Sequence, residues 1–299
     1  MERRYEMNRK ITPAKVIMAF ILSFLALTML VPLLNILAKS LSHPDLVHGL
    51  KGYHIVPRGF SLINYQVILA QPIVIRSVLN SLFITVTGVI LNIGLTASAA
   101  YVLTRPKLAG KKAFMYFLII MMIFDPGIIQ EYFLMKNIGL LDNLWAMVMY
   151  KAVNVYYLII LMRFMENIPA SIVEAATIDG AGHMNILFKV MIPLCKVPLL
   201  TVGMFYGVYR WNEFFHSSIF LTAKSNTVLQ VLLRQFVVQS DTQVIVGAAN
   251  ILANNNIAQL DNGSLKAATI VVAIIPILLL YPIILKYYTS DVLSGGVKG

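Results

Sequence analysis

Cysteine and charge are both scarce in this 299-residue sequence. The only cysteine, Cys195, has no partner in the chain, which excludes a small domain held by disulfide bonds. Charged residues make up 12% of the chain, about half of the roughly 25% found in soluble domains, while apolar residues reach 59%. This composition excludes a disordered chain and a water-soluble globule. Lipid must be the solvent for most of the protein.

Motifs for nucleotide binding and hydrolysis are absent from the sequence. There is no G-x4-G-K-[ST] phosphate loop, no G-x-S-x-G turn and no H-E-x-x-H zinc motif. Three loosely spaced histidines, His43, His48 and His54, are interpreted as solvated loop residues rather than metal ligands. The sequence therefore predicts no catalytic residue, no metal site and no cofactor bound by this chain.

Six apolar stretches are candidate membrane spans, since about 20 residues are needed to cross roughly 30 Å of hydrocarbon. Three have no charged residue and predict continuous helices: Val16–Ala38, Ser77–Thr104 and Ala267–Leu285. Three are interrupted: Ala113–Met135 by Asp125-Pro126-Gly127, Asn143–Met162 by Lys151, and Val197–Ala223 by Arg210-Trp211-Asn212-Glu213. We predict an all-α polytopic membrane protein whose six-helix transmembrane domain covers residues 16–288.

The basic charge of the chain fits this topology. The chain carries 24 lysines and arginines and 13 acidic residues. With six spans, both termini lie on the same side, and that side collects most of the basic residues. The positive-inside rule then places residues 1–15 and 289–299 in the cytoplasm. No clustered basic surface indicates binding to nucleic acid.

Two outer segments are too long for simple turns. Residues 39–76 are rich in proline and glycine and predict irregular structure with short helices. Residues 224–266 open with an amphipathic pattern from Val228 to Phe236 and then turn polar at Asn254-Asn255-Asn256. Such surfaces could receive an external protein or could simply form a lid, and the sequence leaves both alternatives open.

The inner loop 163–196 has stronger local signals. The spacing of Ser171 and Glu174 is that of a capping box and predicts a helix that begins at Ser171. Asp179-Gly180-Ala181-Gly182 is expected to end that helix, and a second helical stretch, Met184–Ile192, is expected to stop at Pro193. A short helix with small surface residues is suited to docking on a partner, although a long loop can contain a helix for no such reason.

The same loop resembles the EAA loop of ABC-transporter permeases. Glu174-Ala175-Ala176, Gly180 and Val190-x-Ile192-Pro193 follow the pattern E-A-A-x3-G-x9-I-x-L-P with two apolar replacements. Four other motifs are similar to the carbohydrate, maltose-permease-like branch: Asn80-Ser81, Gly139-Leu140-Leu141-Asp142, Trp211-Asn212-Glu213 and Gly295-Gly296-Val297-Lys298-Gly299. The resemblance covers nearly the whole chain in order.

This resemblance implies the type I importer permease fold and a multi-pass subunit of a bacterial cytoplasmic membrane importer for a sugar or oligosaccharide. It implies three kinds of partner: a second, related permease, two ATPase subunits that hold ATP and Mg, and an extracytoplasmic solute-binding protein. The residues implied to couple to the ATPase are Glu174, Ala175, Ala176, Asp179, Gly180 and Pro193. The alternative is an ion- or proton-coupled secondary transporter that uses Asp125, Glu131 and Glu213 as a relay.

Candidate substrate-pathway residues are aromatic and polar groups at membrane depth. They are Tyr150, Lys151, Asn154, Tyr209, Trp211, Asn212 and Glu213, with Tyr156, Tyr157 and Tyr206 nearby in sequence. The aromatic residues could equally form an interfacial belt, and Arg210 could pair with Glu213 three residues later. An acidic substrate would favour Lys151 and Arg210 as contacts. Gly203-x3-Gly207 is interpreted as a helix-packing motif.

Overall fold

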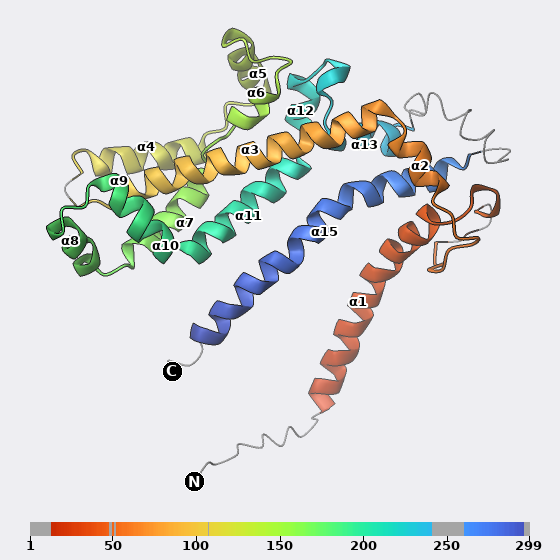
Figure 1. The fold of residues 1–299 in the computed structure, drawn as a ribbon, viewed down its shortest axis with the longest axis horizontal. Coiled ribbons are helices and arrows are strands. Elements are labelled where there is room, and N and C mark those ends of the chain that lie inside the picture. The colour runs from red at the N-terminus through yellow and green to blue at the C-terminus, as the bar shows by residue number, and fades with distance from the viewer. Residues whose placement is uncertain (1–12, 48–49, 51, 107, 241–259, 296–299) are drawn as a thin grey trace. The chain divides into compact units, whose positions relative to one another are not determined.

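The computed structural model describes residues 13–47, 50, 52–106, 108–240 and 260–295 (Figure 1). The regular structure in these ranges is helical, apart from one isolated β-bridge between Ser42 and Phe60. The chain divides into two compact units. One comprises residues 1–70 and 245–272, and the other comprises residues 71–244 and 273–299.

The first unit is dominated by α1 (Pro13–Ser40), which confirms the first predicted apolar helix. None of its apolar window is buried within the chain, as expected for a helix that faces lipid or another subunit. The described residues between α1 and Pro72 are irregular as predicted, with the short helices η1 (Pro44–Leu46) and α2 (Ile63–Leu69). Buried Asn64 ties this loop together by donating to the carbonyl oxygens of Ser40 and Ser42.

The same loop contains the three histidines interpreted from the sequence as solvated loop residues. His43 lies 3.6 Å from Asp45, and His54 lies 3.5 Å from Arg58. His48 is outside the described residues. Among the described residues, no group of three or more histidine, cysteine or acidic side chains could hold a metal ion. The final helix, α15 (Asn262–Gly295), begins in the first unit and continues into the second.

The second unit is built on α3 (Pro72–Leu103), along which α11 (Lys196–Asn212) packs (Figure 1). A Cβ atom added at Gly203 would lie 2.6 Å from Cδ1 of Ile93, and one at Gly207 would lie 3.7 Å from Cγ2 of Val89. The absence of side chains at these two positions therefore lets α11 approach α3 closely. The predicted packing role of Gly203-x3-Gly207 is confirmed.

Two predicted spans are helices bent at a break. α4 (Lys111–Ile123) and α5 (Ile128–Asn137) meet at 114° around Asp125-Pro126-Gly127, where Gly127 has φ 82°. Asp125 stabilises this turn by accepting a hydrogen bond from the backbone N–H of Gly127 at 3.0 Å. The predicted break is confirmed.

The second bent pair joins the loop 163–196 to α11. α9 (His183–Ile186), the π-helical η2 (Leu187–Met191) and α10 (Ile192–Leu194) form one helical run that meets α11 at 86°. The run was expected to stop at Pro193, but it continues through Pro193 and breaks at Cys195. Pro193 lies just after the π-helical η2, where the regular hydrogen bonding of the helix is already interrupted, and the run breaks two residues later.

Residues 143–162 form two short helices rather than one span. α6 (Leu144–Met149) and α7 (Val155–Glu166) are separated by residues 150–154, where Lys151 has φ 47°. Asparagine side chains cap both helices: Asn143 accepts from the N–H of Trp145, and Asn154 accepts from those of Tyr156 and Tyr157. The interruption was predicted at Lys151, and the chain indeed leaves the helical conformation there.

The segment after α11 contains only short helices. They are α12 (Phe215–Phe220), η3 (Lys224–Asn226), α13 (Leu229–Leu233) and the π-helical η4 (Arg234–Val238). Val228, Leu229, Leu232 and Phe236 are buried, so the predicted amphipathic pattern packs against the rest of this unit. Asn254-Asn255-Asn256 lie outside the described residues.

The described chain has three helices long and apolar enough to span a membrane, namely α1, α3 and the first part of α15, or up to five if each bent pair is one span. α6 and α7 have 6 and 12 residues, too few for either to cross alone. Six spans, and the cytoplasmic placement of both termini, stay predictions.

Candidate functional site

The loop expected to couple the chain to a partner contains α8 (Ala170–Ile178). The capping-box prediction is wrong, because the helix begins at Ala170 with Pro169 at the cap position and no side-chain cap. Pro169 is extended (φ −53°, ψ 129°), so the transition to helix occurs one residue before Ser171. Ser171 is therefore already helical and cannot act as the cap residue.

The end of α8 is a Schellman motif. The N–H of Gly180 donates to the carbonyl of Thr177 at 3.1 Å, and that of Ala181 donates to the carbonyl of Ala176 at 2.9 Å. Gly180 has φ 79°, a left-handed conformation that glycine adopts without strain. The predicted break after α8 is confirmed, and it gives the helix a rigid, defined end.

Most of the surface of α8 is exposed. Val173 and Ala176 pack against an apolar cluster, whereas Glu174, Ala175 and Asp179 are exposed. Ile178 is 85% exposed, and a Cβ atom added at Gly180 would have no neighbour within 4 Å. The predicted coupling residues from Glu174 to Gly180 therefore lie mainly on the outer face of one short helix. Pro193 lies apart from that helix in sequence, exposed in α10.

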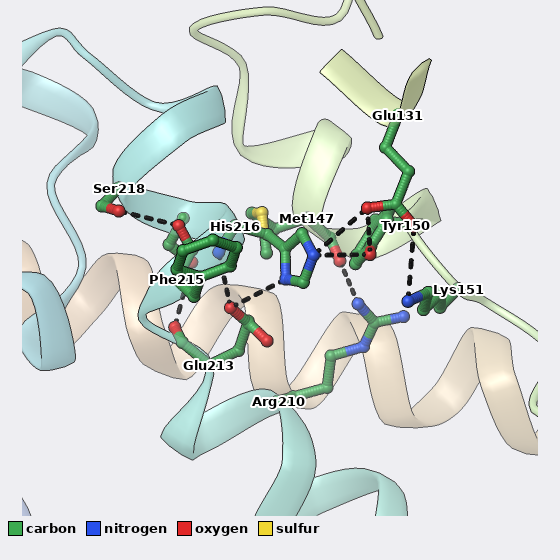
Figure 2. A network of polar contacts seen from close by, with 10 residues as sticks. Glu131, Met147, Tyr150, Lys151, Arg210, Glu213, Phe215, His216 and Ser218 are labelled. Atoms are coloured by element: carbon green, nitrogen blue, oxygen red, sulfur yellow. Dashed lines mark hydrogen bonds and ion pairs between the residues drawn. The ribbon is translucent and has the colours of Figure 1, made fainter. Parts of the chain in front are cut away.

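A second candidate site is a polar network beside the middle of α3 (Figure 2). Its centre is Glu131 of α5, whose Oε2 accepts a hydrogen bond from Tyr150 Oη at 2.8 Å and lies 3.2 Å from His216 Nε2. Its Oε1 lies 3.4 Å from Lys151 Nζ. The network brings together α5, α12 and the break between α6 and α7.

His216 bridges two carboxylates. One ring nitrogen faces Glu131, and Nδ1 lies 3.2 Å from Glu213 Oε1, which also accepts the backbone N–H of His216 at 2.7 Å. The suggested Arg210–Glu213 pair is not formed. α11 ends at Asn212 and Glu213 is extended (φ −71°, ψ 106°), so the helical spacing that would join them is lost. Sequence analysis missed His216, whose signal was a polar side chain in an apolar stretch.

Arg210 is buried and holds the end of α6. Its guanidinium donates to the carbonyl oxygens of Met147 and Val148 and to Oδ1 of Asn92. The last carbonyls of a helix have no partner within it, and a cation there is favourable because of the helix dipole. Arg210 therefore fixes α6 to α11 and α3, which is a structural role.

The other predicted substrate residues have different surroundings. Trp211 is buried and donates through Nε1 to the carbonyl of Ala273 at 3.1 Å, and Asn154 caps α7. Tyr209 is half-buried with its ring 5.9 Å from the Arg210 guanidinium carbon, and Asn212 is exposed and bonds within its own helix. Among the predicted set, the network brings together Tyr150, Lys151 and Glu213.

Asp142 ties the Gly139–Asp142 motif to the segment after α12. Its carboxylate accepts hydrogen bonds from the N–H of Ala223 at 2.7 Å and from the Thr222 hydroxyl at 2.8 Å. These bonds, together with one from the N–H of Thr222, hold the pKa of the Asp142 carboxyl below its ordinary value. The motif therefore has a structural role in joining two loops.

No family model matches the sequence. The chain is 35% identical over 289 residues to the polygalacturonan/rhamnogalacturonan transport system permease protein YtcP of Bacillus subtilis, covering 95% of this chain and 97% of that protein. It is also 33% identical to Protein LplC of the same organism, and that match covers 92% of this chain and 90% of LplC.

Two further comparisons concern a more distant relative and a solved structure. The diacetylchitobiose uptake system permease protein NgcG of Streptomyces coelicolor is 29% identical over 73% of this chain and 68% of its own length. The fold is similar to that of a chain in the crystal structure of a bacterial ABC transporter involved in the import of the acidic polysaccharide alginate. The TM-score is 0.84 and the sequence identity is 31%. That match covers 91% of this chain and 95% of the other.

Proposed function

The chain belongs to the sugar permeases of ABC importers, and from that premise we propose that it admits an acidic oligosaccharide and is driven through α8 by a separate ATPase subunit. As a permease it is a transport subunit and a membrane protein rather than an enzyme. Its proposed partners are a second permease, two ATPase subunits that bind ATP and Mg, and an extracytoplasmic binding protein. Its proposed location is the bacterial cytoplasmic membrane.

The exposed outer face of α8 carries the coupling proposal. Ile178 is 85% exposed, and two residues later Gly180 has no neighbour at its Cβ position, so this end of α8 is suited to close contact with another protein. Glu174 and Asp179 add exposed carboxylates that can pair with cationic side chains. The inner face is anchored through Val173 and Ala176, so force applied to α8 reaches the helices of the second unit.

The proposed substrate class follows from the relatives. Polygalacturonan, rhamnogalacturonan and alginate all contain uronic acids, and proteins named for their transport or import are 35% and 31% identical to this chain. Diacetylchitobiose is neutral, and the permease named for its uptake is less similar, at 29% identity. An oligosaccharide with carboxylate groups is therefore the substrate class best supported.

Coupling through α8 is tested in the complete importer, reconstituted in vesicles with its ATPase subunits and binding protein. Gly180→Trp places a bulky side chain at φ 79°, and Ile178→Asp puts a charge on the outer face. Both should reduce ATPase co-purification and ATP-driven uptake at least tenfold while membrane insertion persists. Ile138→Asp, an exposed apolar position at the end of α5, is the matched control.

Two outcomes contradict this proposal. If both α8 variants retain the ATPase and transport at the wild-type rate, α8 is not the coupling element. If the wild-type chain alone drives uptake from an ion or proton gradient, the secondary-transporter alternative is correct.

A further inference from the structure

Glu131 has three partners, two from the break between α6 and α7 and one from α12, and one of them is replaceable. Tyr150 Oη and His216 Nε2 lie 2.8 and 3.2 Å from its Oε2, and Lys151 Nζ lies 3.4 Å from its Oε1. The lysine contact is the longest of the three. When the ammonium of Lys151 moves away, the carboxylate of Glu131 keeps two partners.

Lys151 is also the most exposed side chain of this group. Its side chain is 48% exposed, against 10% for Glu131 and 17% for His216. A lysine ammonium is a compact charge on a flexible stem, so it can move to a new carboxylate without a change in the backbone. Val153 and Asn154, which follow in the same break, are exposed as well. The break between α6 and α7 is therefore open to a ligand around Lys151.

The backbone at Lys151 is held from both sides. Its φ of 47° lies in a region that residues other than glycine rarely adopt, and such conformations persist where the surroundings impose them. Before it, Arg210 holds the carbonyl oxygens of Met147 and Val148. After it, Asn154 caps α7. The fold thus fixes the backbone of Lys151, whereas its ammonium is held, among the described residues, only by the 3.4 Å contact with Glu131 and by the Tyr150 ring 5.1 Å away.

We propose that Lys151 is a specificity-determining residue whose ammonium exchanges the carboxylate of Glu131 for a carboxylate of the sugar in transit. This inference rests on the proposed acidic substrate. A sugar carboxylate offers the lysine the same charge that Glu131 offers, whereas a sugar hydroxyl does not. A neutral sugar therefore leaves the Glu131–Lys151 pair closed, and an acidic one opens it.

The test uses the complete importer in vesicles, with the binding protein saturated either with a uronate oligosaccharide or with its uncharged methyl ester. Lys151→Gln should lower uptake of the acid about tenfold relative to the ester, the effect of losing one charge-assisted hydrogen bond. Lys151→Arg keeps the positive charge and should retain most of the wild-type ratio of acid uptake to ester uptake. Lys136→Gln, an exposed lysine at the end of α5, is the matched control and should change neither rate.

A double variant guards against a folding defect. Glu131→Gln with Lys151→Gln removes both charges and leaves no carboxylate unpaired, and it should show the same selective loss for the acid. Two results would overturn the proposal. One is uptake of the acid at the wild-type rate by the Lys151→Gln variant, and the other is an equal loss of acid and ester uptake in both the single and the double variant. Uptake of the ester but not the acid by the wild-type importer would instead refute the proposed substrate class.

Discussion

The two halves of α3 are packed in different ways. Its C-terminal half, with Ala97, Ala100 and Leu103, lies in an apolar cluster with α7, η2 and the start of α11. Its N-terminal half bears buried polar side chains that bond to neighbouring segments. Asn80 donates to the carbonyls of Ser225 and Thr227, and Ser81 accepts from the N–H of Leu229.

This difference follows from helix length. Around the N-terminal half, α6, α12 and α13 have only 5 or 6 residues, so most of their backbone groups are terminal and need partners from side chains. Around the C-terminal half, α7 and α11 are longer and satisfy their own backbone, so apolar packing predominates. The buried polar side chains there, Asn92 and Thr96, bond to the side chains of Arg210 and Tyr206 on α11. In an apolar solvent, broken helices require buried polar side chains, and a substrate path can then use the same polar groups.

The largest expected effect comes from removing Arg210. Arg210→Met should destabilise the protein by about 3 kcal/mol or more, because the carbonyls of Met147 and Val148 and the amide oxygen of Asn92 lose their buried donor, at about 1–3 kcal/mol for each acceptor left unsatisfied. Thermal unfolding of the detergent-solubilised chain measures this loss. Arg163→Met is the control, since Arg163 pairs with Glu166 at the surface and should contribute less than about 1 kcal/mol. Equal effects would show that the polar half does not depend on Arg210.

An intermediate effect is expected where α11 crosses α3. Gly203→Leu should destabilise the protein by about 1–3 kcal/mol, because a Cβ atom there already meets Ile93 at 2.6 Å. Gly94→Leu on α3 is the matched control, since its Cβ position has no neighbour within 4 Å and leucine favours a helix over glycine. Thermal unfolding of the two variants should shift in opposite directions. A similar shift in both would mean that close packing does not limit this contact.

The sequence predicts the continuous and broken helices of this molecule well, and it predicts their polar contacts poorly. The bend at Asp125-Pro126-Gly127 and the glycine packing of α11 were recognisable because proline and glycine act locally. The cap of α8 was misassigned because Pro169, directly before the helix, sets its first residue. Glu213 pairs with His216 rather than Arg210 because α11 ends at Asn212. Arg210 instead bonds to carbonyls of a segment about 60 residues away, which no local spacing encodes.

The smallest expected effect concerns Asp142, in the loop between α5 and α6. Hydrogen bonds, the first of them from the N–H of Ala223, lower the pKa of this carboxyl below its ordinary value of 3.8. A lowered pKa in the folded state means that the unfolded chain binds the proton more readily. The Asp142 contribution to stability is therefore complete above about pH 5 and is lost as the pH falls through the folded-state pKa.

Asp142→Asn should flatten this acid dependence, because an amide keeps the shape of the side chain without a titrating group. Unfolding of the wild type and the variant is compared between about pH 6 and pH 3, and the two curves should converge at the acid end. Because Asp142 is exposed, solvent weakens the effect, and it should be smaller than that of either helix substitution. Parallel curves over the whole range would show that the loop contacts of Asp142 do not stabilise the polar half.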